Sequence, residues 1–107
     1  MAIDYDTVKQ AVTEYVRDVA EVMPVSKAVL FGSYAKGTAT DQSDVDICFF
    51  LDSFNGQRSV DIVAKMLRLT HDFSTIYIEP HAFETSDIDN DNPFLKEVLS
   101  TGEEILI

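Results

Sequence analysis

The sequence predicts a two-layer α/β (α+β) domain that spans residues 1–107. Three observations indicate this fold class: apolar residues recur at helical spacing in some segments, they alternate with polar residues in others, and the two kinds of segment follow one another along the chain. A chain of 107 residues can bury about 60–65% of the surface that its unfolded form exposes, so it can fold without disulfides. We therefore expect one domain without repeats or linkers.

The first expected element is an amphipathic helix. Asp4 or Asp6 can cap its start, and Pro24 follows its end. Lys9 and Arg17 face away from its apolar stripe. That stripe, at helical spacing, consists of Val8, Ala11, Val12, Tyr15, Val16, Val19, Ala20 and Met23.

Two strands that flank a glycine-containing turn are expected next. A short buried strand covers residues 27–31 and is stopped by Gly32. One helical turn over residues 33–36 closes at Gly37. After a polar loop, the alternation of apolar and polar residues over 44–51 predicts a second strand.

The remaining part of the chain continues the alternation. A broad apolar face over residues 60–73 predicts a core helix. Residues 75–79 predict a third strand, which the proline that follows either ends or places at a sheet edge. A short last helix has Asn92 as its N-cap and Gly102 just past its end. Residues 103–107 are expected to be extended and to pack their isoleucines on the core.

Composition and charge restrict the function classes. The chain carries 19 acidic and 8 basic residues, a net charge of −11. Such a surface disfavours a nucleic-acid substrate, although bound Mg²⁺ would reverse the field locally. A single cysteine, Cys48, excludes an internal disulfide and fits a reducing compartment. No apolar run approaches the roughly 20 residues that span a bilayer, and no signal-peptide pattern is present, so we expect a cytoplasmic protein that does not contact membranes.

Two aspartates predict a metal site. Asp44 and Asp46 alternate with Val45 and Ile47, so in an extended strand both carboxylates project from the same side of the sheet. Their Cα atoms would lie roughly 6.6 Å apart, at about 3.3 Å per residue. Two bare acids facing each other would raise each other's pKa, whereas together they can hold one or two divalent cations. The pair is therefore expected to bind metal.

Gly32 and Ser33 form a candidate phosphate site just before this pair. A glycine after a buried strand lets the backbone approach a ligand, and the first amides of a following helical turn point N–H groups toward it. Lys36 is a further candidate for contact with phosphate. For Ser43, capping the entry to the second strand and a ligand role both stay open. Amides for phosphates and carboxylates for metals together suit phosphoryl chemistry.

Glycines, serines and acids recur at a specific spacing over residues 32–46, namely at Gly32, Ser33, Ala35, Gly37, Ser43, Asp44 and Asp46. This pattern resembles the motif of the minimal nucleotidyltransferases of the DNA polymerase β superfamily, and the resemblance covers essentially the whole chain. It implies the nucleotidyltransferase fold, a short mixed sheet with helices packed on it. It also implies transfer of a nucleoside monophosphate, usually AMP from ATP, to a hydroxyl group, with two Mg²⁺ ions held by three carboxylates. Neither a P-loop nor a dinucleotide-binding glycine motif is present.

The resemblance also implies a third carboxylate on the strand beside the Asp-x-Asp strand. There it holds the metal that activates the attacking hydroxyl and can act as its base. Thr75, Tyr77 and Glu79 share one face of the third predicted strand, so Glu79 is the acid available on it. In relatives an acid nearer the start of the strand, where Thr75 stands, is expected. Glu79 is therefore a candidate catalytic residue and metal ligand, with a solvated edge residue as the alternative, and His81 is expected to be a surface or hydrogen-bonding histidine.

Small proteins of this kind are similar to the antitoxin half of bacterial toxin–antitoxin pairs. The resemblance implies AMP transfer to a tyrosine of an all-helical ribonuclease toxin of the higher eukaryotes and prokaryotes nucleotide-binding (HEPN) class. The acidic surface would suit a more basic partner. We expect acceptor recognition to come from that partner or from a second copy of the chain. Two alternatives stay open: neutralisation or scaffolding of the partner by binding alone, and transfer to a small molecule such as an aminoglycoside.

Overall fold

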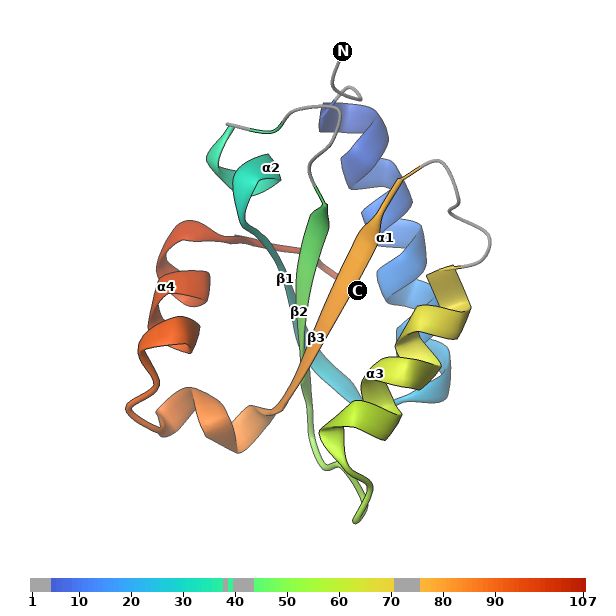
Figure 1. Cartoon of the computed structure of the whole chain (residues 1–107), viewed down its shortest axis with the longest axis vertical. Coiled ribbons are helices and arrows are strands. Elements are labelled where there is room, and N and C mark those ends of the chain that lie inside the picture. Colours follow the sequence, from blue (N-terminus) through green and yellow to red (C-terminus); the bar gives the residue numbers. More distant parts are fainter. Residues whose placement is uncertain (1–4, 38, 40–43, 71–75) are drawn as a thin grey trace.

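The computed structural model describes residues 5–37, 39, 44–70 and 76–107. Helices and strands follow one another along this part of the chain, and the predicted α+β class is confirmed (Figure 1). The helices are α1 (Tyr5–Val22), α2 (Ser33–Lys36), α3 (Ser59–Arg68), the 3₁₀ helix η2 (Thr85–Asp89) and α4 (Pro93–Thr101). The strands are β1 (Val25–Phe31), β2 (Val45–Leu51), β3 (Ile78–Glu84) and β4 (Glu103–Glu104).

The four strands form one mixed sheet in the order β3-β2-β1-β4. β1 runs antiparallel to both β2 and β4, whereas β2 and β3 are parallel. A parallel pair needs a crossover connection, and the segment that contains α3 supplies it. The short mixed sheet that the resemblance implies is therefore confirmed.

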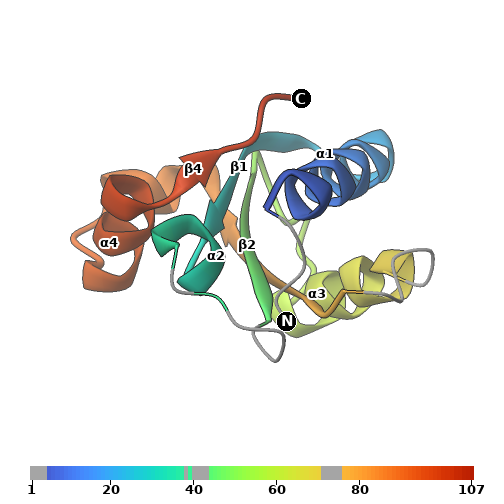
Figure 2. The same ribbon diagram turned by 90° about the horizontal axis from the view of Figure 1, so that it is seen from above.

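Helices cover both faces of the sheet, as the view from above shows (Figure 2). The odd-numbered residues of β2 pack in one cluster with apolar residues of α1 and α3. Cys48 and Phe50 point to the opposite face and pack with Leu95 and Val98 of α4. Because both faces of β2 are apolar, this strand is the buried centre of the sheet. The expected packing of helices on a sheet is found, with α4 as an additional cover on the second face.

α1 lies where its periodicity predicts a helix. Its buried residues include Tyr15, whose O–H donates to the carbonyl of Met66 at 2.7 Å. The Tyr15 ring also meets Phe49 edge-on, with the ring centroids 5.8 Å apart. The hydrogen bond lets this large side chain be buried with its hydroxyl satisfied, and it ties α1 to α3. Neither α1 nor any other described helix is long and apolar enough to cross a membrane.

Local capping signals act as the sequence predicts. Gly37 ends α2 in the left-handed conformation, with a φ of 74°. The Oδ1 atom of Asn92 accepts hydrogen bonds from the backbone N–H groups of Phe94 and Leu95 at 2.9 and 3.3 Å. α4 begins at Pro93, which fits the first position of a helix because its missing N–H would have no helical acceptor there.

The predicted bounds of the third strand are wrong. We expected a strand over 75–79, whereas β3 spans Ile78–Glu84 and continues through Pro80. Pro80 is tolerated because β3 is an edge strand, where a residue without an N–H group can face away from the neighbouring strand. Thr75, the start of the predicted strand, lies outside the described residues.

The C-terminal segment packs less completely than expected. β4 pairs with β1, and Ile105 is buried, with its N–H bonded to the carbonyl of Ala28 at 2.8 Å. Ile107 stays 58% exposed, so only the first of the two isoleucines packs on the core.

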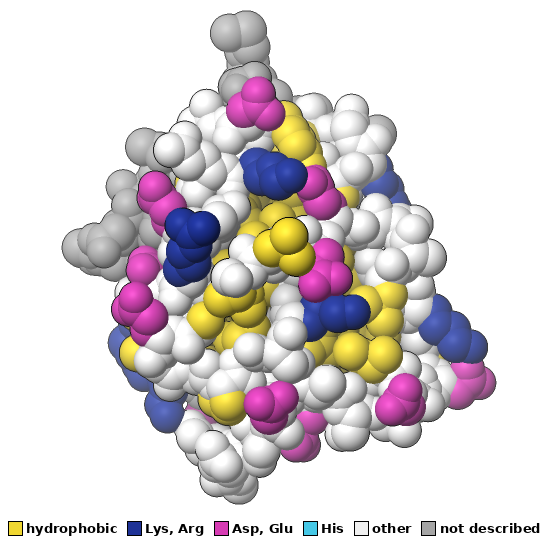
Figure 3. Space-filling model, turned by 180° about the vertical axis from the view of Figure 1, so that it is seen from behind, with side chains coloured by type: hydrophobic (Ala, Val, Ile, Leu, Met, Phe, Trp, Pro, Cys, Tyr) yellow, Lys and Arg dark blue, Asp and Glu magenta, His cyan; other side chains and the backbone are white. Residues whose placement is uncertain are grey.

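On the face that lies behind Figure 1, apolar side chains gather near the middle among charged ones (Figure 3).

Candidate active site

The end of β1 and the starts of β2 and β3 meet at one end of the sheet, and most of the predicted site residues lie there. Phe31, the last residue of β1, pairs with Asp46 in β2. Asp46 in turn pairs with Glu79 in β3, and Gly32 follows Phe31 directly. The register therefore places the candidate phosphate-binding turn beside Asp46, with Glu79 one strand further on.

Asp46, Glu79 and His81 form a compact cluster of potential metal ligands. One ligand atom of each residue lies within 4.8 Å of those of the other two. The Nε2 atom of His81 is 3.6 Å from Oδ1 of Asp46, which is too long for a hydrogen bond. Both side chains are partly exposed, at 30% for His81 and 23% for Asp46. The parallel register of β2 and β3 brings together groups from two separate segments.

Glu79 has the electrostatic properties of a crowded carboxylate. Loss of hydration raises its pKa above the ordinary value, the charge of Asp46 and a hydrogen bond with Asp46 raise it further, and His81 lowers it. Two carboxylates at this separation repel each other, and a cation between them would remove the repulsion. Glu79 thus lies where a carboxylate can share a cation with Asp46.

Asp44 flanks the cluster rather than joining it. It lies immediately before β2, is exposed, and does not belong to the three-residue group of ligands. Its charge is nevertheless close enough to contribute to the raised pKa of Glu79. Its role as a second aspartate ligand stays a prediction.

Gly32 is required by the geometry of this corner. Its φ of 80° and ψ of −152° fall in a region essentially confined to glycine. A Cβ atom at this position would lie 2.6 Å from Oδ2 of Asp46, closer than atoms can approach without displacement. The backbone of the turn into α2 therefore lies directly against the Asp46 carboxylate.

The other candidate phosphate ligands lie around this turn. Ser33 begins α2, and the first turn of a helix leaves backbone N–H groups without helical acceptors. Lys36 instead forms an ion pair through its Nζ with Oε1 of Glu97 in α4, at 3.2 Å. Both of these side chains are exposed, and such pairs add little stability, so the lysine can exchange its partner for a phosphate. Ser43 lies outside the described residues.

His81 is the member of the cluster that sequence reasoning missed. Its Nε2 atom is buried and has no hydrogen-bond partner among the residues that the structure describes. The imidazole packs against the rings of Phe31 and Phe94, with centroid distances of 5.2 and 6.0 Å. The spacing of two between Glu79 and His81 is a signal that both share one side of a strand. The sequence, however, predicted a strand that ended before His81.

Two hollows adjoin this corner. One, of about 450 Å³, lies beside β3 and is lined by Glu79, His81 and residues of α3. The other, of about 190 Å³, is lined by Phe31, Gly32, Lys36 and residues of α4. Ligands therefore have room next to both the carboxylates and the glycine turn.

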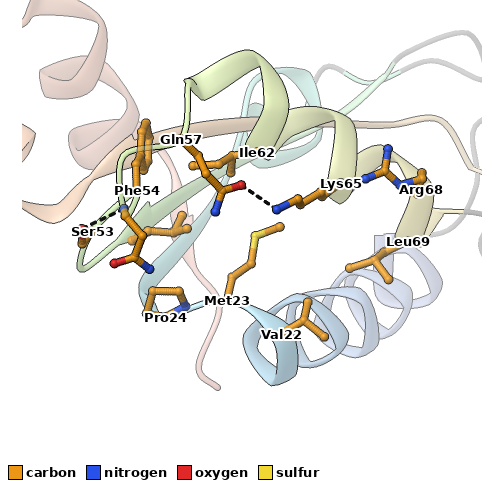
Figure 4. A pocket seen from close by; sticks show the side chains of 12 residues that line it. Val22, Met23, Pro24, Ser53, Phe54, Gln57, Ile62, Lys65, Arg68 and Leu69 are labelled. Carbon is orange, nitrogen blue, oxygen red and sulfur yellow. Dashed lines mark hydrogen bonds between the residues drawn. The ribbon is translucent and has the colours of Figure 1, made fainter.

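A third pocket, of about 320 Å³, lies elsewhere (Figure 4). Its lining includes Pro24, Leu51 and Arg68, and no carboxylate of the described residues takes part. Leu51 lies at the far end of β2 from Asp46, roughly 16 Å away at about 3.3 Å per residue. Lys65 points into this pocket and donates to Oε1 of Gln57 at 2.5 Å. This pocket is separate from the cluster and offers no comparable set of metal ligands.

The donors of the cluster fit a divalent cation. Carboxylate oxygens are ligands for hard cations, and a neutral imidazole nitrogen is a common metal ligand. The buried Nε2 of His81 supports this fit, because a polar atom removed from water without a partner is unusual in a folded protein. Asp46, Glu79 and His81 would hold such a cation, with Asp44 beside them.

Comparisons with known proteins bear on the family and the fold of the chain. The family model described as the nucleotidyltransferase domain matches residues 12–93, which include the whole cluster and Gly32. Among solved structures, the crystal structure of a candidate nucleotidyltransferase from Sulfolobus solfataricus superimposes with a TM-score of 0.66. The two chains are 22% identical, and the match covers 79% of this chain and 74% of the other, which shows a shared fold. No curated protein matches the chain.

Proposed function

This chain belongs to the nucleotidyltransferase domain family, and from that premise we propose that it transfers AMP from ATP to a hydroxyl group of a partner protein. The family and the fold support the general class of reaction, nucleotidyl transfer. The identity of the nucleotide and that of the acceptor are our proposal. The observation that supports it best is the pairing of Asp46 with Glu79 beside the Gly32 turn. That pairing puts cation ligands next to a backbone suited to phosphate.

The proposed reaction is a displacement at the α-phosphorus of ATP. The oxygen of the acceptor hydroxyl attacks that phosphorus, and the bond to the bridging oxygen of the departing pyrophosphate breaks. The hydroxyl proton would pass to the carboxylate of Glu79, which pairs with Asp46 across the neighbouring strand. Bound Mg²⁺, two ions in the expected arrangement, would neutralise charge on the phosphates and lower the pKa of the attacking hydroxyl.

The residues have separate proposed roles. Asp44, Asp46 and Glu79 would hold Mg²⁺. The backbone of Gly32 and Ser33, together with the hydroxyl group of Ser33, would hold the phosphates of ATP. We propose Lys36 and Ser43 as additional phosphate ligands.

We propose that the partner is a helical toxin of the HEPN class and that the chain acts as its antitoxin in the cytoplasm. The net charge of −11 supports a partner with a basic surface, because complementary charge speeds association and excludes acidic competitors. The partial exposure of the cluster supports a protein side chain as acceptor, since a tyrosine on another protein can reach it.

The test uses ATP labelled on its α-phosphate, Mg²⁺ and the product of the neighbouring gene. The partner should become labelled, and Asp46→Asn should reduce the labelling rate at least about 100-fold, because the cation loses a charged ligand beside the reacting phosphate. Asp52→Asn is the matched control, since Asp52 is exposed and follows β2 at its opposite end. Equal labelling by wild type and Asp46→Asn would end the proposal, and label on the chain itself would identify a second copy as the acceptor.

The same variants separate catalysis from neutralisation by binding alone. If the chain acts only as a binder, Asp46→Asn should bind and neutralise the toxin as well as the wild type does. Loss of neutralisation with partner binding preserved would favour the enzyme. Partner binding is measured by calorimetry, and neutralisation by rescue of growth in cells that express the toxin.

A further inference from the structure

One nitrogen atom at the candidate site is unexplained by the fold. The Nε2 atom of His81 is buried and has no hydrogen-bond partner among the described residues. The nearest charged group is Asp46, whose Oδ1 lies 3.6 Å away, beyond hydrogen-bonding distance. Buried polar atoms in folded proteins nearly always have a partner, so an orphaned one suggests that a ligand completes the site.

The surroundings of the imidazole hold it in place without offering that partner. Phe31 and Phe94 pack against the ring, with centroids 5.2 and 6.0 Å away. Aromatic rings orient the imidazole by van der Waals contact, but they carry no lone pair that could satisfy an N–H group. The Nε2 atom is therefore held 3.6 Å from Oδ1 of Asp46, and a ring nitrogen of His81 lies within 4.8 Å of a carboxylate oxygen of Glu79.

We infer that His81 is a direct ligand of the site cation and that the site therefore favours Mn²⁺ over Mg²⁺ more strongly than carboxylates alone would. The inference rests on the proposed function in one respect, because it takes Asp46 and Glu79 as the metal site of that reaction. The ligand set is then two carboxylate oxygens and one imidazole nitrogen.

The chemistry of the ligands gives the reason for this preference. Mg²⁺ is bound in proteins almost entirely by oxygen and keeps several water ligands. Carboxylate oxygens suit both Mg²⁺ and Mn²⁺, whereas Mn²⁺, as a first-row transition metal, accepts an imidazole nitrogen more readily than Mg²⁺ does. An oxygen-only site would gain little affinity for Mn²⁺ over Mg²⁺, so the nitrogen of His81 should account for much of the difference between the two ions.

A spectroscopic test reports the bond directly. Mn²⁺ is added to the full chain without ATP, and electron spin-echo spectroscopy is used to detect coupling between the manganese electrons and a ¹⁴N nucleus. We expect nitrogen coupling of the size typical of a coordinated imidazole in the wild type. That coupling should disappear in His81→Phe, a variant that keeps an aromatic ring beside Phe31 and Phe94.

The other histidine is the matched control. His71, which lies outside the described residues, is the second of the two histidines in the chain. His71→Phe should retain the nitrogen coupling. Coupling that is absent from the wild type, or that survives in His81→Phe, overturns the inference.

Calorimetric titration of the two ions gives an independent readout. In His81→Phe the affinity for Mn²⁺ should fall about 10-fold or more, as for loss of a metal ligand, while the affinity for Mg²⁺ changes less than about threefold. Equal losses for both ions would show a structural role only and would overturn the assignment. Circular dichroism in the presence of a chelator checks that the variant is folded.

Failure of this inference and failure of the proposed function are distinguishable. Labelled transfer to the partner without nitrogen coupling would preserve the function and overturn the role of His81. Nitrogen coupling without any transfer would preserve His81 as a ligand and remove the proposed reaction.

Discussion

The two ends of the sheet both carry a hollow, but they differ in how well their polar groups are satisfied. At the end where β2 finishes, the pocket is lined by Leu51 and other apolar residues, and Lys65 is bonded to Gln57. At the end where β2 begins, Asp46 and Glu79 crowd each other, and Nε2 of His81 has no hydrogen-bond partner among the described residues.

This difference teaches that a cavity is a weaker indication of function than unsatisfied electrostatics. The lining of the apolar pocket holds no carboxylate among the described residues, and its Lys65 is bonded to Gln57. The acidic end is destabilised by like charges that a cation would compensate. We therefore expect substitutions at the apolar end to change stability and those at the acidic end to change metal binding and transfer.

The largest expected effect on stability is at the apolar end. Leu51 is 2% exposed, so Leu51→Ala should leave a cavity and lower the free energy of unfolding by about 3 kcal/mol. Urea denaturation measures this loss. The affinity of the folded variant for Mn²⁺ should stay within about twofold of the wild type, and a larger change would mean that the two ends are coupled.

Metal binding should stabilise the folded protein only through the acidic end of the sheet. Mn²⁺ at 100 times its dissociation constant should raise the free energy of unfolding by about 2.7 kcal/mol, because the ion binds the folded chain alone. Thermal and urea denaturation with and without the ion measure the gain. Asp46→Asn should abolish most of it, and Leu51→Ala should retain it. Retention in Asp46→Asn would contradict the assignment of this cluster as the metal site.

Alanine substitutions at two glycines distinguish the stability cost of backbone strain from that of steric conflict. Gly32→Ala should lower the free energy of unfolding by about 1–3 kcal/mol, from its φ of +80° together with a Cβ placed 2.6 Å from Asp46 Oδ2. Gly37→Ala has a similar φ of +74° but no neighbour within 4 Å, so it should cost about 1 kcal/mol from strain alone. Both are measured by urea denaturation, and metal affinity should fall only in Gly32→Ala. A similar loss of metal affinity in both variants would exclude direct displacement of Asp46 as the cause.

The smallest effect is the pH dependence of the metal-free protein. Folding raises the pKa of Glu79, so the folded state binds more protons than the unfolded state between the ordinary and the raised pKa. Stability should therefore decrease as the pH rises through that window. Glu79→Gln should remove part of this decrease, which urea denaturation in the presence of a chelator would detect. An unchanged pH dependence would show that Glu79 is not perturbed in solution.

Local signals allowed much of the fold to be predicted. The stripe of α1, the closure of α2 at Gly37 and the cap of α4 at Asn92 each depend on residues a few positions apart, and each is found. The bounds of β3 were wrong because its pairing with β2 is not local. Of the two alternatives for Pro80, the strand end is wrong and the position at a sheet edge is confirmed.

The candidate site likewise has a part that local signals predict and a part that they do not. The Gly32 turn and the strand that carries Asp46 could be located from neighbouring residues. Glu79 was a candidate from its position in a predicted strand, but its pairing with Asp46 could not be derived. The place of His81 in the cluster was not predicted, because it depends on the continuation of β3 past Pro80 and on rings contributed by β1 and α4.

The amino-acid sequence alone determined the α+β class, the acidic surface and the motif from Gly32 to Asp46, since these depend on composition and on short-range spacing. Only the tertiary structure decided that Glu79 and His81 meet Asp46. The physical reason is that the packing of the helices and the sheet as a whole sets the register of parallel strands joined by a crossover. No short segment of the chain contains that information.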